Sequence, residues 1–546
     1  MKNILVVLKY FDLAIMESTQ FIPLGIIYIA TVLKRNRYNV ITLTIKENDA
    51  SHMKYIEILD ETIKKHNIDV VCSGALSPDH WFIKNMFKTV KSINKNIVTI
   101  LGGGGISSNP KIVYEDTLTD YGIINEGEFS IIQLMKHISG GGGDTEIINI
   151  PGLVYKNHKG ETIINPSSNI ENLDAIPFPD FTLFPEFEKA ILKTGEYPIL
   201  LSRSCPFKCT FCFHTCGSTY RKRSLDNIFQ EISFAVNRYK IRKIYLNDEL
   251  FIDNKERIKD FCERIKKFNL SFNGQTRADV ITKETLVMLK EAGCKSIGIG
   301  LESMNNDVLK SMKKRVTRQQ IDDAYKMTKE IGLSVGGNII VGDIAESLET
   351  ADESIKWFVQ NYTQYNLDII NIRVLPGTEL YNYAVKKGII KCETEYINSG
   401  NYEINITNMS DEEFAYINKK IAQLGYCIHR GVEFLEVINI NRESHTVDLN
   451  IECLSCRKAF IVNDNPVDKV LYVCPYCHSN ILLYMKKILK EHDLELSKDI
   501  EAVEAIDSNI RKKRNYKERI KNIIKKYLPF RIYIIMRALK NRIYNK

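Results

Sequence analysis

The chain has 546 residues, of which 44% are hydrophobic and 26% are charged. This composition is typical of a folded globular protein, and the length suggests two or three domains. No run reaches the roughly 18–20 consecutive apolar residues that a membrane-spanning helix needs. The apolar N-terminal run lacks a small-residue cleavage site, so we interpret it as a β-strand and expect a cytoplasmic protein.

The formal net charge is +8, and it is concentrated at the C-terminus. Residues 511–546 contain 14 lysines and arginines and one acid, so this tail carries +13 and the rest of the chain −5. The 13 cysteines are an odd number, and seven of them fall in two tight clusters. This usage argues against a secreted disulfide framework and favours metal binding in a reducing compartment.

Residues 1–140 alternate between strand-like and helix-like segments. Short apolar runs such as ILVVL, VITLTI and NIVTILGG alternate with stretches of helical spacing. This order predicts an α/β domain with a doubly wound, Rossmann-like parallel sheet, whose ligands bind beyond the carboxyl ends of the strands. Ser73, Gly102 and Gly103 fall at those ends, and glycine lets the backbone approach a large ligand closely. The alternative is a degenerate module that binds nothing or binds a nucleotide.

Residues 141–195 are punctuated by glycine and proline, which predicts an interdomain linker. Residues 196–390 then contain six strand–helix repeats. Six such units predict a partial (β/α)6 barrel of the TIM type, in which catalytic residues lie at the C-terminal ends of the strands. The expected strands are PILLSRS, KIYLND, LSFNGQT, SIGIGLES, SVGGNIIVG and DIINIRV.

Three cysteines follow the first of these strands. Cys205, Cys209 and Cys212 have C-x3-C-x2-C spacing. Each thiolate can hold one corner of an iron–sulfur cube, which leaves one of the four irons without a protein ligand. An open iron can bind and activate a substrate directly. A redox or zinc site is the alternative for three close cysteines, and their position at a barrel strand's end favours the cube.

The cysteine motif, with Phe211 just before the last cysteine, resembles the radical S-adenosylmethionine (SAM) superfamily. The resemblance implies that the open iron of a 4Fe-4S cluster binds the amino and carboxylate groups of SAM. One electron then cleaves SAM to methionine and a 5′-deoxyadenosyl radical. By the same resemblance, Phe211 lines the cofactor, and either Asp248 or Glu249, after the second strand, binds the methionine amino group.

Two further strand ends resemble the same family. Gly298 to Ser303 is similar to the family's G-x-E-S, which implies that Glu302 and Ser303 contact SAM. Asn338, on the fifth strand, lies in a segment that resembles a ribose-contacting strand. The chain departs from the family's G-x-P-G-E-T pattern between Gly342 and Ser347, which leaves the role of the acid there open.

The first domain resembles the cobalamin-binding domain that precedes many radical SAM enzymes. The resemblance rests on three segments, Ile22 to Ala30, Leu101 to Gly103 and Asn125 to Glu128. It implies that Gly102 and Gly103 contact cobalamin, and we expect the same of Ser73 from its position at a neighbouring strand end. The chain has no D-x-H-x-x-G motif, so we predict no histidine ligand on the lower face of the cobalt.

The expected reaction follows from this subclass. Its usual chemistry is methylation of an unactivated carbon by methylcobalamin, with a second SAM restoring the methyl group. Radical cyclisation or rearrangement without methyl transfer is the enzymatic alternative. A non-catalytic metal-binding interaction protein is the other rival, against which the intact cysteine motif argues.

The C-terminal third carries a second cysteine cluster. Residues 391–450 are a connecting region, and residues 451–485 hold two C-x2-C pairs separated by 17 residues. This spacing predicts a zinc-ribbon-like module with a closed, structural zinc site, and a second iron–sulfur cluster is the rival. The four cysteines are Cys453, Cys456, Cys474 and Cys477.

Residues 486–546 form a charged, helix-like extension. Its end mixes basic and apolar residues at helical spacing, which suits an anionic membrane surface or a solvated helix packed on the protein. Contact with the inner membrane surface is therefore one expectation. No nucleic-acid-binding module is recognisable. We expect an electron donor such as flavodoxin or ferredoxin, and a small-molecule, lipid or glycan substrate.

Overall fold

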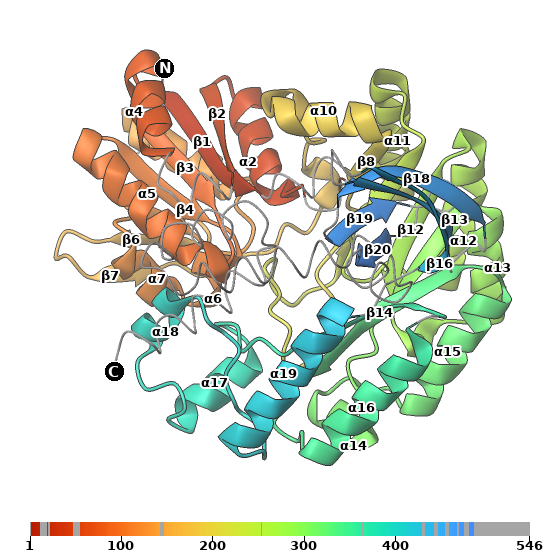
Figure 1. Ribbon diagram of the computed structural model, residues 1–546. Helices are drawn as coiled ribbons and strands as arrows, with labels where there is room; N and C mark the ends of the chain where they lie inside the picture. Colours follow the sequence, from red (N-terminus) through yellow and green to blue (C-terminus); the bar gives the residue numbers. More distant parts are fainter. Residues whose placement is uncertain are drawn as a thin grey trace.

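The structure is a computed structural model. It consists of two α/β halves that lie side by side, with the C-terminal elements below and beside them (Figure 1). None of the helices in the described part of the chain is both long and apolar enough to cross a membrane. The described residues are 2–10, 19, 22–46, 55–141, 147–252, 254–362, 364–427, 432–441, 446–453, 458–466, 469–473 and 480–484.

The N-terminal half contains a seven-stranded sheet in the order β2-β1-β3-β4-β5-β6-β7. The first five strands are parallel, which confirms the predicted doubly wound domain. Ile4 to Leu8 in β1 are almost completely buried, because helices cover both faces of the sheet. The strands are β1 (Asn3–Tyr10), β2 (Asn39–Lys46), β3 (Val70–Gly74), β4 (Val98–Gly102), β5 (Tyr121–Ile123), β6 (Leu153–Lys156) and β7 (Thr162–Ile164). The helices include α2 (Leu24–Arg35), α4 (Tyr55–His66), α5 (His80–Ile93), α6 (Gly104–Ser108), α7 (Pro110–Asp116) and α8 (Ser130–Lys136).

The segment 141–195 differs from a plain linker. Its strand β6 pairs antiparallel with β5 at the edge of the parallel strands, β7 pairs antiparallel with β6, and α10 (Pro185–Thr194) follows them. Phe181, Phe184 and Phe187 are completely buried. Strands of three or four residues give no periodic signal, so proline and glycine dominated the sequence pattern there.

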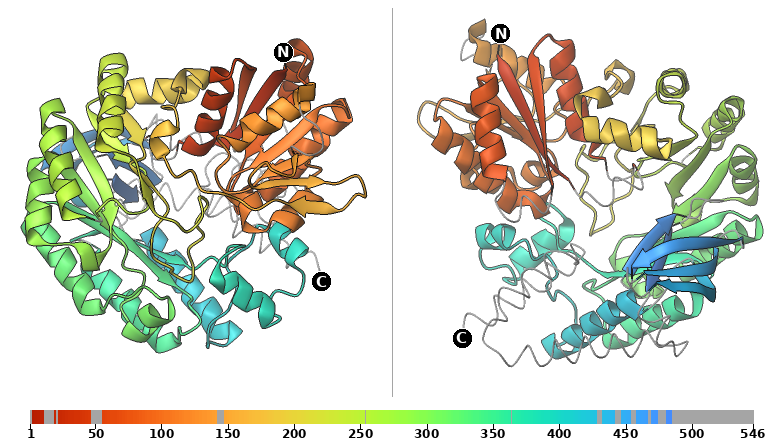
Figure 2. Two further views of the ribbon diagram at one scale, coloured as in Figure 1. Left: turned by 180° about the vertical axis from the view of Figure 1, so that it is seen from behind. Right: turned by 45° about the horizontal axis from the view of Figure 1, so that its top comes forward.

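The second half is a six-stranded parallel sheet in the order β15-β14-β13-β12-β11-β8. The strands follow one another in chain order with helices between them, which confirms the partial (β/α)6 barrel (Figure 2). The strands are β8 (Glu196–Ile199), β11 (Lys243–Leu246), β12 (Ser271–Thr276), β13 (Cys294–Ile299), β14 (Ser334–Val341) and β15 (Asn366–Asn371). The helices are α11 (Leu225–Tyr239), α12 (Lys255–Ile265), α13 (Lys283–Glu291), α14 (Asn306–Ser311), α15 (Arg318–Glu330) and α16 (Leu348–Asn361).

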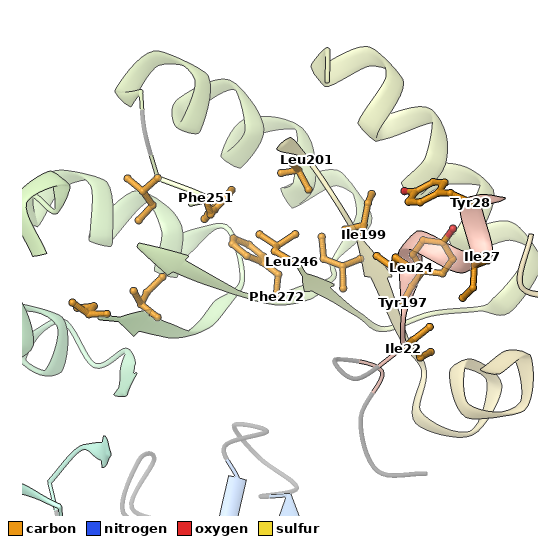
Figure 3. Close-up of a cluster of buried hydrophobic side chains, with 14 of the residues drawn as sticks. Ile22, Leu24, Ile27, Tyr28, Tyr197, Ile199, Leu201, Leu246, Phe251 and Phe272 are labelled. Atoms are coloured by element: carbon orange, nitrogen blue, oxygen red, sulfur yellow. The ribbon is translucent and has the colours of Figure 1, made fainter. Parts of the chain in front are cut away.

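One apolar core joins the two halves. Tyr28 from α2 lies in the same cluster as Tyr197 and Ile199 from β8 (Figure 3). In the barrel, Phe272 of β12 packs against Phe261 of α12, so the even-numbered positions of β12 face the helices. The odd-numbered positions therefore line the inner face of the barrel.

The elements after the barrel return to the N-terminal half. α17 (Glu379–Lys386) and α18 (Glu393–Ser399) precede α19 (Asp411–Cys427). Asn398 donates a hydrogen bond to Asp116 of α7 over 2.9 Å, which ties α18 to the first domain. The antiparallel strands β16 (Val432–Asn441), β17 (Thr446–Cys453) and β18 (Ala459–Pro466) follow, and then β19 (Lys469–Val473) pairs with β20 (Asn480–Tyr484).

Candidate active site

The three cysteines of the first cluster lie in the loop of a small hairpin. Its strands, β9 (Ser202–Arg203) and β10 (Arg221–Lys222), pair antiparallel directly after β8. Ser204 has a φ of 66°, and its hydroxyl donates to the Gly217 carbonyl over 2.7 Å, which closes the base of the loop. The loop therefore begins at the C-terminal end of the first barrel strand, as the sequence predicted.

Backbone contacts fix the middle of this cysteine loop. The Thr210 amide donates to the Met312 carbonyl over 3.1 Å, and the Thr210 carbonyl accepts from the Leu380 amide over 3.2 Å. Phe211 is half-buried and packs against an apolar cluster that includes Met312 and Leu380. In the structure, Phe211 thus anchors the loop to α14 and α17, and its contact with the cofactor stays a prediction.

The thiols keep the exposure that a cluster ligand needs. Cys205 and Cys209 are half-buried, and Cys212 is exposed. A hydrogen bond from the Cys212 thiol, together with the cations Lys314 and Arg277, lowers the pKa of Cys209 below its usual range despite burial. Burial raises the pKa of Cys205, and the hydrogen bond to Cys209 raises the pKa of Cys212, so Cys209 is the thiol of the three whose surroundings favour the thiolate, the form that binds iron.

The two neighbouring acids after β11 point in opposite directions. Glu249 Oε2 lies 3.1 Å from Nδ1 of His214 in the cysteine loop, and this contact raises the pKa of His214. Asp248 is buried, and its carboxylate accepts from the Leu201 amide over 3.0 Å and from Ser202. Glu249 is therefore the acid beside the cysteines, while Asp248 fixes the end of the first barrel strand.

Glu302 forms a buried ion pair beside the cysteine loop. Its Oε1 lies 2.6 Å from Nζ of Lys314, which is one of the two cations near Cys209. Glu302 has a φ of 64°, and its amide donates to the Asn338 carbonyl over 3.0 Å. A Cβ at Gly300 would lie 2.4 Å from Glu302 Oε1, so the pair requires glycine there.

The other predicted SAM contacts divide between the two sides of the sheet. Ser303 Oγ lies 3.3 Å from Ser354 Oγ in α16 and accepts from the Asn305 amide over 3.2 Å. Ser303 therefore faces the helices and not the cysteine loop. The Asn338 side chain is exposed on the inner face of β14, where a ligand can reach it.

The residues at the barrel's C-terminal edge fit SAM and a 4Fe-4S cluster. Three thiolates can ligate three irons and leave the fourth open. Asn247 and Asn371, at the ends of β11 and β15, each have a buried amide nitrogen or oxygen without a hydrogen-bond partner among the described residues. Buried polar atoms are usually paired, so this edge suits a polar ligand.

The N-terminal domain presents a glycine edge, Gly102 to Gly105, to the cysteine loop. Gly103 has a φ of 85°, and a Cβ there would lie 3.0 Å from the Ala75 carbonyl oxygen. A Cβ at Gly104 would lie 2.6 Å from Cγ2 of Thr215, a residue of the cysteine loop. Gly103 and Gly104 are therefore needed for close packing within the protein, whereas a Cβ at Gly102 would meet only the Ile123 carbonyl oxygen at 3.8 Å, which leaves room for a large ligand such as cobalamin beside the backbone there.

Ser73 does not contribute a free side chain to that edge. Its hydroxyl donates to the Val7 carbonyl over 2.8 Å and so joins β3 to β1. His80, seven residues after Ser73, is buried, and its Nε2 lies 2.8 Å from Asp116. The prediction of no histidine ligand to cobalt remains a prediction.

Three residues of the site were missed by the sequence analysis. His214 follows Cys212 by two residues, and this proximity was a usable signal. Lys314 and Arg277 come from other barrel repeats, and no local spacing marks them. Arg277 lies 3.6 Å above the ring of Phe207 and so brings a positive charge to the cysteine loop.

The second cysteine cluster is only partly visible. Cys453 ends β17, is buried, and its amide donates to the Lys458 carbonyl over 3.0 Å. Cys456, Cys474 and Cys477 lie outside the described residues, as does the extension at 486–546.

Comparison with known proteins identifies both halves. Residues 199–358 match the model of the radical SAM superfamily, and residues 18–133 match that of the B12 binding domain. An uncharacterised methyltransferase of Pyrococcus horikoshii is 28% identical over 376 residues, which cover 67% of this chain and 79% of that protein. The anaerobic magnesium-protoporphyrin IX monomethyl ester cyclase of Rubrivivax gelatinosus is 28% identical over 61% of each chain.

A solved structure shares the fold. The radical SAM methyltransferase TsrM of Kitasatospora setae, solved with tryptophan and a SAM analogue, superposes with a TM-score of 0.60 at 16% identity. The match covers 71% of this chain and 77% of TsrM. The two family matches coincide with the two α/β halves, and the cysteine loop lies within the barrel match. The chain therefore belongs to the radical SAM enzymes that carry a B12-binding domain.

Proposed function

We propose that this enzyme transfers a methyl group from cobalamin to an unactivated carbon of its substrate. The observation that carries the proposal is the contact between the glycine edge and the cysteine loop. Thr215 packs at the Gly104 position, where a Cβ would lie 2.6 Å from Cγ2 of Thr215 and 3.8 Å from Cε1 of Phe213. The regions that would hold cobalamin and the cluster are therefore neighbours, as transfer to a newly formed substrate radical requires.

When bound, the cluster with SAM supplies a radical that removes a hydrogen atom, and cobalamin supplies the methyl group. The chain's own residues would bind and orient these groups and exclude water from them. Cys205, Cys209 and Cys212 would hold the cluster. Glu249, oriented by His214, would accept a hydrogen bond from the ammonium group of the SAM methionine. The Glu302–Lys314 ion pair would hold the neighbouring part of the site in place.

Anaerobic reconstitution with iron, sulfide and hydroxocobalamin tests this function. We would add dithionite and SAM with extracts of the source cells, and measure 5′-deoxyadenosine, S-adenosylhomocysteine and methyl-labelled product. The proposal predicts both nucleosides in equal amounts, because each methylation consumes two SAM and two electrons. Deoxyadenosine with a converted substrate but no S-adenosylhomocysteine would contradict methyl transfer.

Deoxyadenosine and converted substrate without S-adenosylhomocysteine would instead indicate the alternative function, a radical cyclisation or rearrangement. The cyclase of Rubrivivax gelatinosus shares the same 28% identity as the methyltransferase of Pyrococcus horikoshii, over 61% of this chain against 67%. A cyclisation or rearrangement would use the same radical step and would leave the methyl group of SAM on methionine. The ratio of the two nucleosides therefore separates the two reactions.

We propose that a flavodoxin or ferredoxin supplies the electrons and that the substrate is a small molecule, lipid or glycan. The basic extension, residues 486–546, is our candidate for contact with an anionic membrane surface. Removal of residues 511–546 should then abolish sedimentation with anionic vesicles. Unchanged sedimentation would contradict the membrane role.

We also propose a structural zinc ion at the second cysteine cluster. In the sequence, the first C-x2-C pair begins at the last residue of β17 and precedes β18, and the second pair falls between β19 and β20; each of these two strand pairs is antiparallel. Elemental analysis should find one zinc per chain, and a variant with Cys453→Ser and Cys474→Ser should lose it. About four additional irons per chain in place of zinc would identify a second iron–sulfur cluster.

A further inference from the structure

We propose that Glu126 and Glu128 are positioning residues that set the separation between the two cofactors. They belong to the N-terminal domain, and they form ion pairs with Arg203 and Arg221 of the hairpin that carries the cysteine loop. The inference rests on the proposed function only in placing cobalamin at the glycine edge. It does not depend on which reaction the two cofactors carry out.

Four side chains form one interdomain network. Arg203 Nη1 lies 2.7 Å from Glu126 Oε1, and Arg203 Nη2 lies 2.5 Å from Glu128 Oε1. Arg221 Nη1 lies 2.5 Å from the other oxygen of Glu126. The four side chains are at most 9% exposed. Glu126 thus holds both arginines at once, and neither acid is available to a ligand from solvent.

The two arginines lie where the cysteine loop begins and where it ends. Arg203 is the last residue of β9, two positions before Cys205, and Arg221 is the first residue of β10. The Arg203 guanidinium also lies 5.5 Å from the ring centre of Tyr28 in α2. Both strands that frame the loop are therefore tied to the domain that presents the glycine edge.

A second set of contacts makes this attachment rigid. Glu126 Oε2 accepts from the Ile170 amide over 2.7 Å, and Arg221 donates to the Ile170 carbonyl over 2.9 Å and to the Cys216 carbonyl over 3.0 Å. An arginine held by two planar partners fixes direction as well as distance. Such a network suits a role in alignment, because displacements of about 1 Å can cost 10²-fold in rate.

The network explains a motif that the reaction itself leaves unused. Asn125 to Glu128 resembles the cobalamin-binding domain, and these acids follow β5 at the sheet's carboxyl edge. In the structure their carboxylates point to the hairpin and not into the open site. The motif therefore serves the junction between the two cofactor domains.

The experiment compares Glu126→Gln with Glu231→Gln in the full-length holoenzyme. Glutamine keeps the shape of glutamate and removes its charge. Glu231 is an equally buried acid, and its Oε2 lies 2.6 Å from Arg223, which follows β10 in the barrel half. Iron and cobalamin contents are measured first. The dipolar splitting between cob(II)alamin and the reduced cluster is then read by electron paramagnetic resonance.

We expect Glu126→Gln to keep both cofactors and to shift or broaden the splitting, while Glu231→Gln keeps the wild-type splitting. Deoxyadenosine released per converted substrate should rise roughly tenfold or more in Glu126→Gln, because radical formation continues without productive transfer. A wild-type splitting in Glu126→Gln would overturn the proposal, as would an equal shift in Glu231→Gln.

A milder variant covers the case in which Glu126→Gln does not fold. Glu128→Gln removes one contact of Arg203 and leaves the bridge to Arg221 intact, so a smaller shift of the splitting is expected. No shift in this variant would then overturn the proposal. Absence of a methylated product from the wild-type enzyme, with the splitting still responsive, would contradict methyl transfer and leave the positioning role standing.

Discussion

The barrel and the N-terminal domain meet at the cysteine loop, but their facing edges differ in which atoms they present, side chains or backbone. The barrel edge consists of side chains, with thiols, the Glu249–His214 pair and the Glu302–Lys314 pair. The N-terminal edge consists of backbone, because Ser73 turns into its sheet and glycines follow β4. A radical cluster needs ligands, whereas a corrin needs a fitted surface. Substitutions at the two edges should therefore fail in different ways.

The largest effect is expected from Cys209→Ala, which removes one of the three cluster ligands. We expect loss of the cluster's absorbance and of all deoxyadenosine formation, with cobalamin still bound at the other edge. Iron analysis, a cobalamin assay and chromatography of the nucleosides measure the three quantities. Cys392→Ala is the matched control, because Cys392 is exposed at the start of α18 and should leave all three unchanged. Loss of cobalamin from Cys209→Ala would show that the two edges are not independent.

The next effect separates two adjacent acids of the barrel edge. Glu249→Ala removes the acid that we propose binds the ammonium group of SAM, and such contacts contribute about 1.5–3 kcal/mol, so the KM for SAM should rise roughly 10–100-fold. The melting temperature should hardly change, because the side chain is 42% exposed. Asp248→Ala should do the reverse, since it leaves the Leu201 amide without its acceptor and costs about 1–3 kcal/mol of stability.

Kinetics and thermal scans on the same two preparations give the answer. The opposite pattern, with a raised KM in Asp248→Ala and a normal one in Glu249→Ala, would reverse our assignment of the two acids. It would also show that the inner face of the barrel is not where SAM binds.

Asp248 and Glu249 show which features of the site the sequence could predict and which it could not. The six barrel strands and the cysteine loop follow from apolar periodicity and from motif spacing, and the structure places them as predicted. The choice between Asp248 and Glu249 depends on strand parity, because alternate residues face opposite sides of a sheet. In the structure, Ile244 of β11 pairs with Phe272 of β12, which packs on α12, so even-numbered positions face the helices and Asp248 continues on that side.

Contacts between distant segments were beyond the sequence. Arg203 and Glu126 are 77 residues apart, and a single sequence carries no signal that pairs them. Ser73 and Ser303 stood at the correct strand ends, but a serine hydroxyl bonds equally well to a ligand or to a neighbouring main chain. The structure shows the second partner in both cases.

A pH effect should also distinguish Asp248 from its exposed neighbour. Burial raises the pKa of Asp248 from 3.8 to about 6. The folded state then holds the proton more tightly than the unfolded state, so this group's contribution to stability falls as pH rises from about 4 to about 6. The loss amounts to about 3 kcal/mol, which corresponds to a few degrees in melting temperature.

Thermal scans of the cofactor-free protein between pH 4 and pH 7 measure this effect. Asp248→Asn keeps an acceptor for the Leu201 amide and removes the titration, so its melting temperature should decline less over that window than that of the wild type. Parallel curves for the two proteins would mean that Asp248 titrates at its ordinary pKa.

The smallest effects concern the backbone edge, where two neighbouring glycines should respond differently. Gly103 has a φ of 85° and lies against Ala75, so Gly103→Ala should cost about 1–3 kcal/mol and lower the melting temperature of the cofactor-free protein. A Cβ at Gly102 would meet only the Ile123 carbonyl oxygen at 3.8 Å. Gly102→Ala should therefore leave the melting temperature unchanged and weaken cobalamin binding, which equilibrium dialysis measures. Unchanged cobalamin affinity in Gly102→Ala would place the corrin away from this edge, and the two edges would then no longer face a common reaction space.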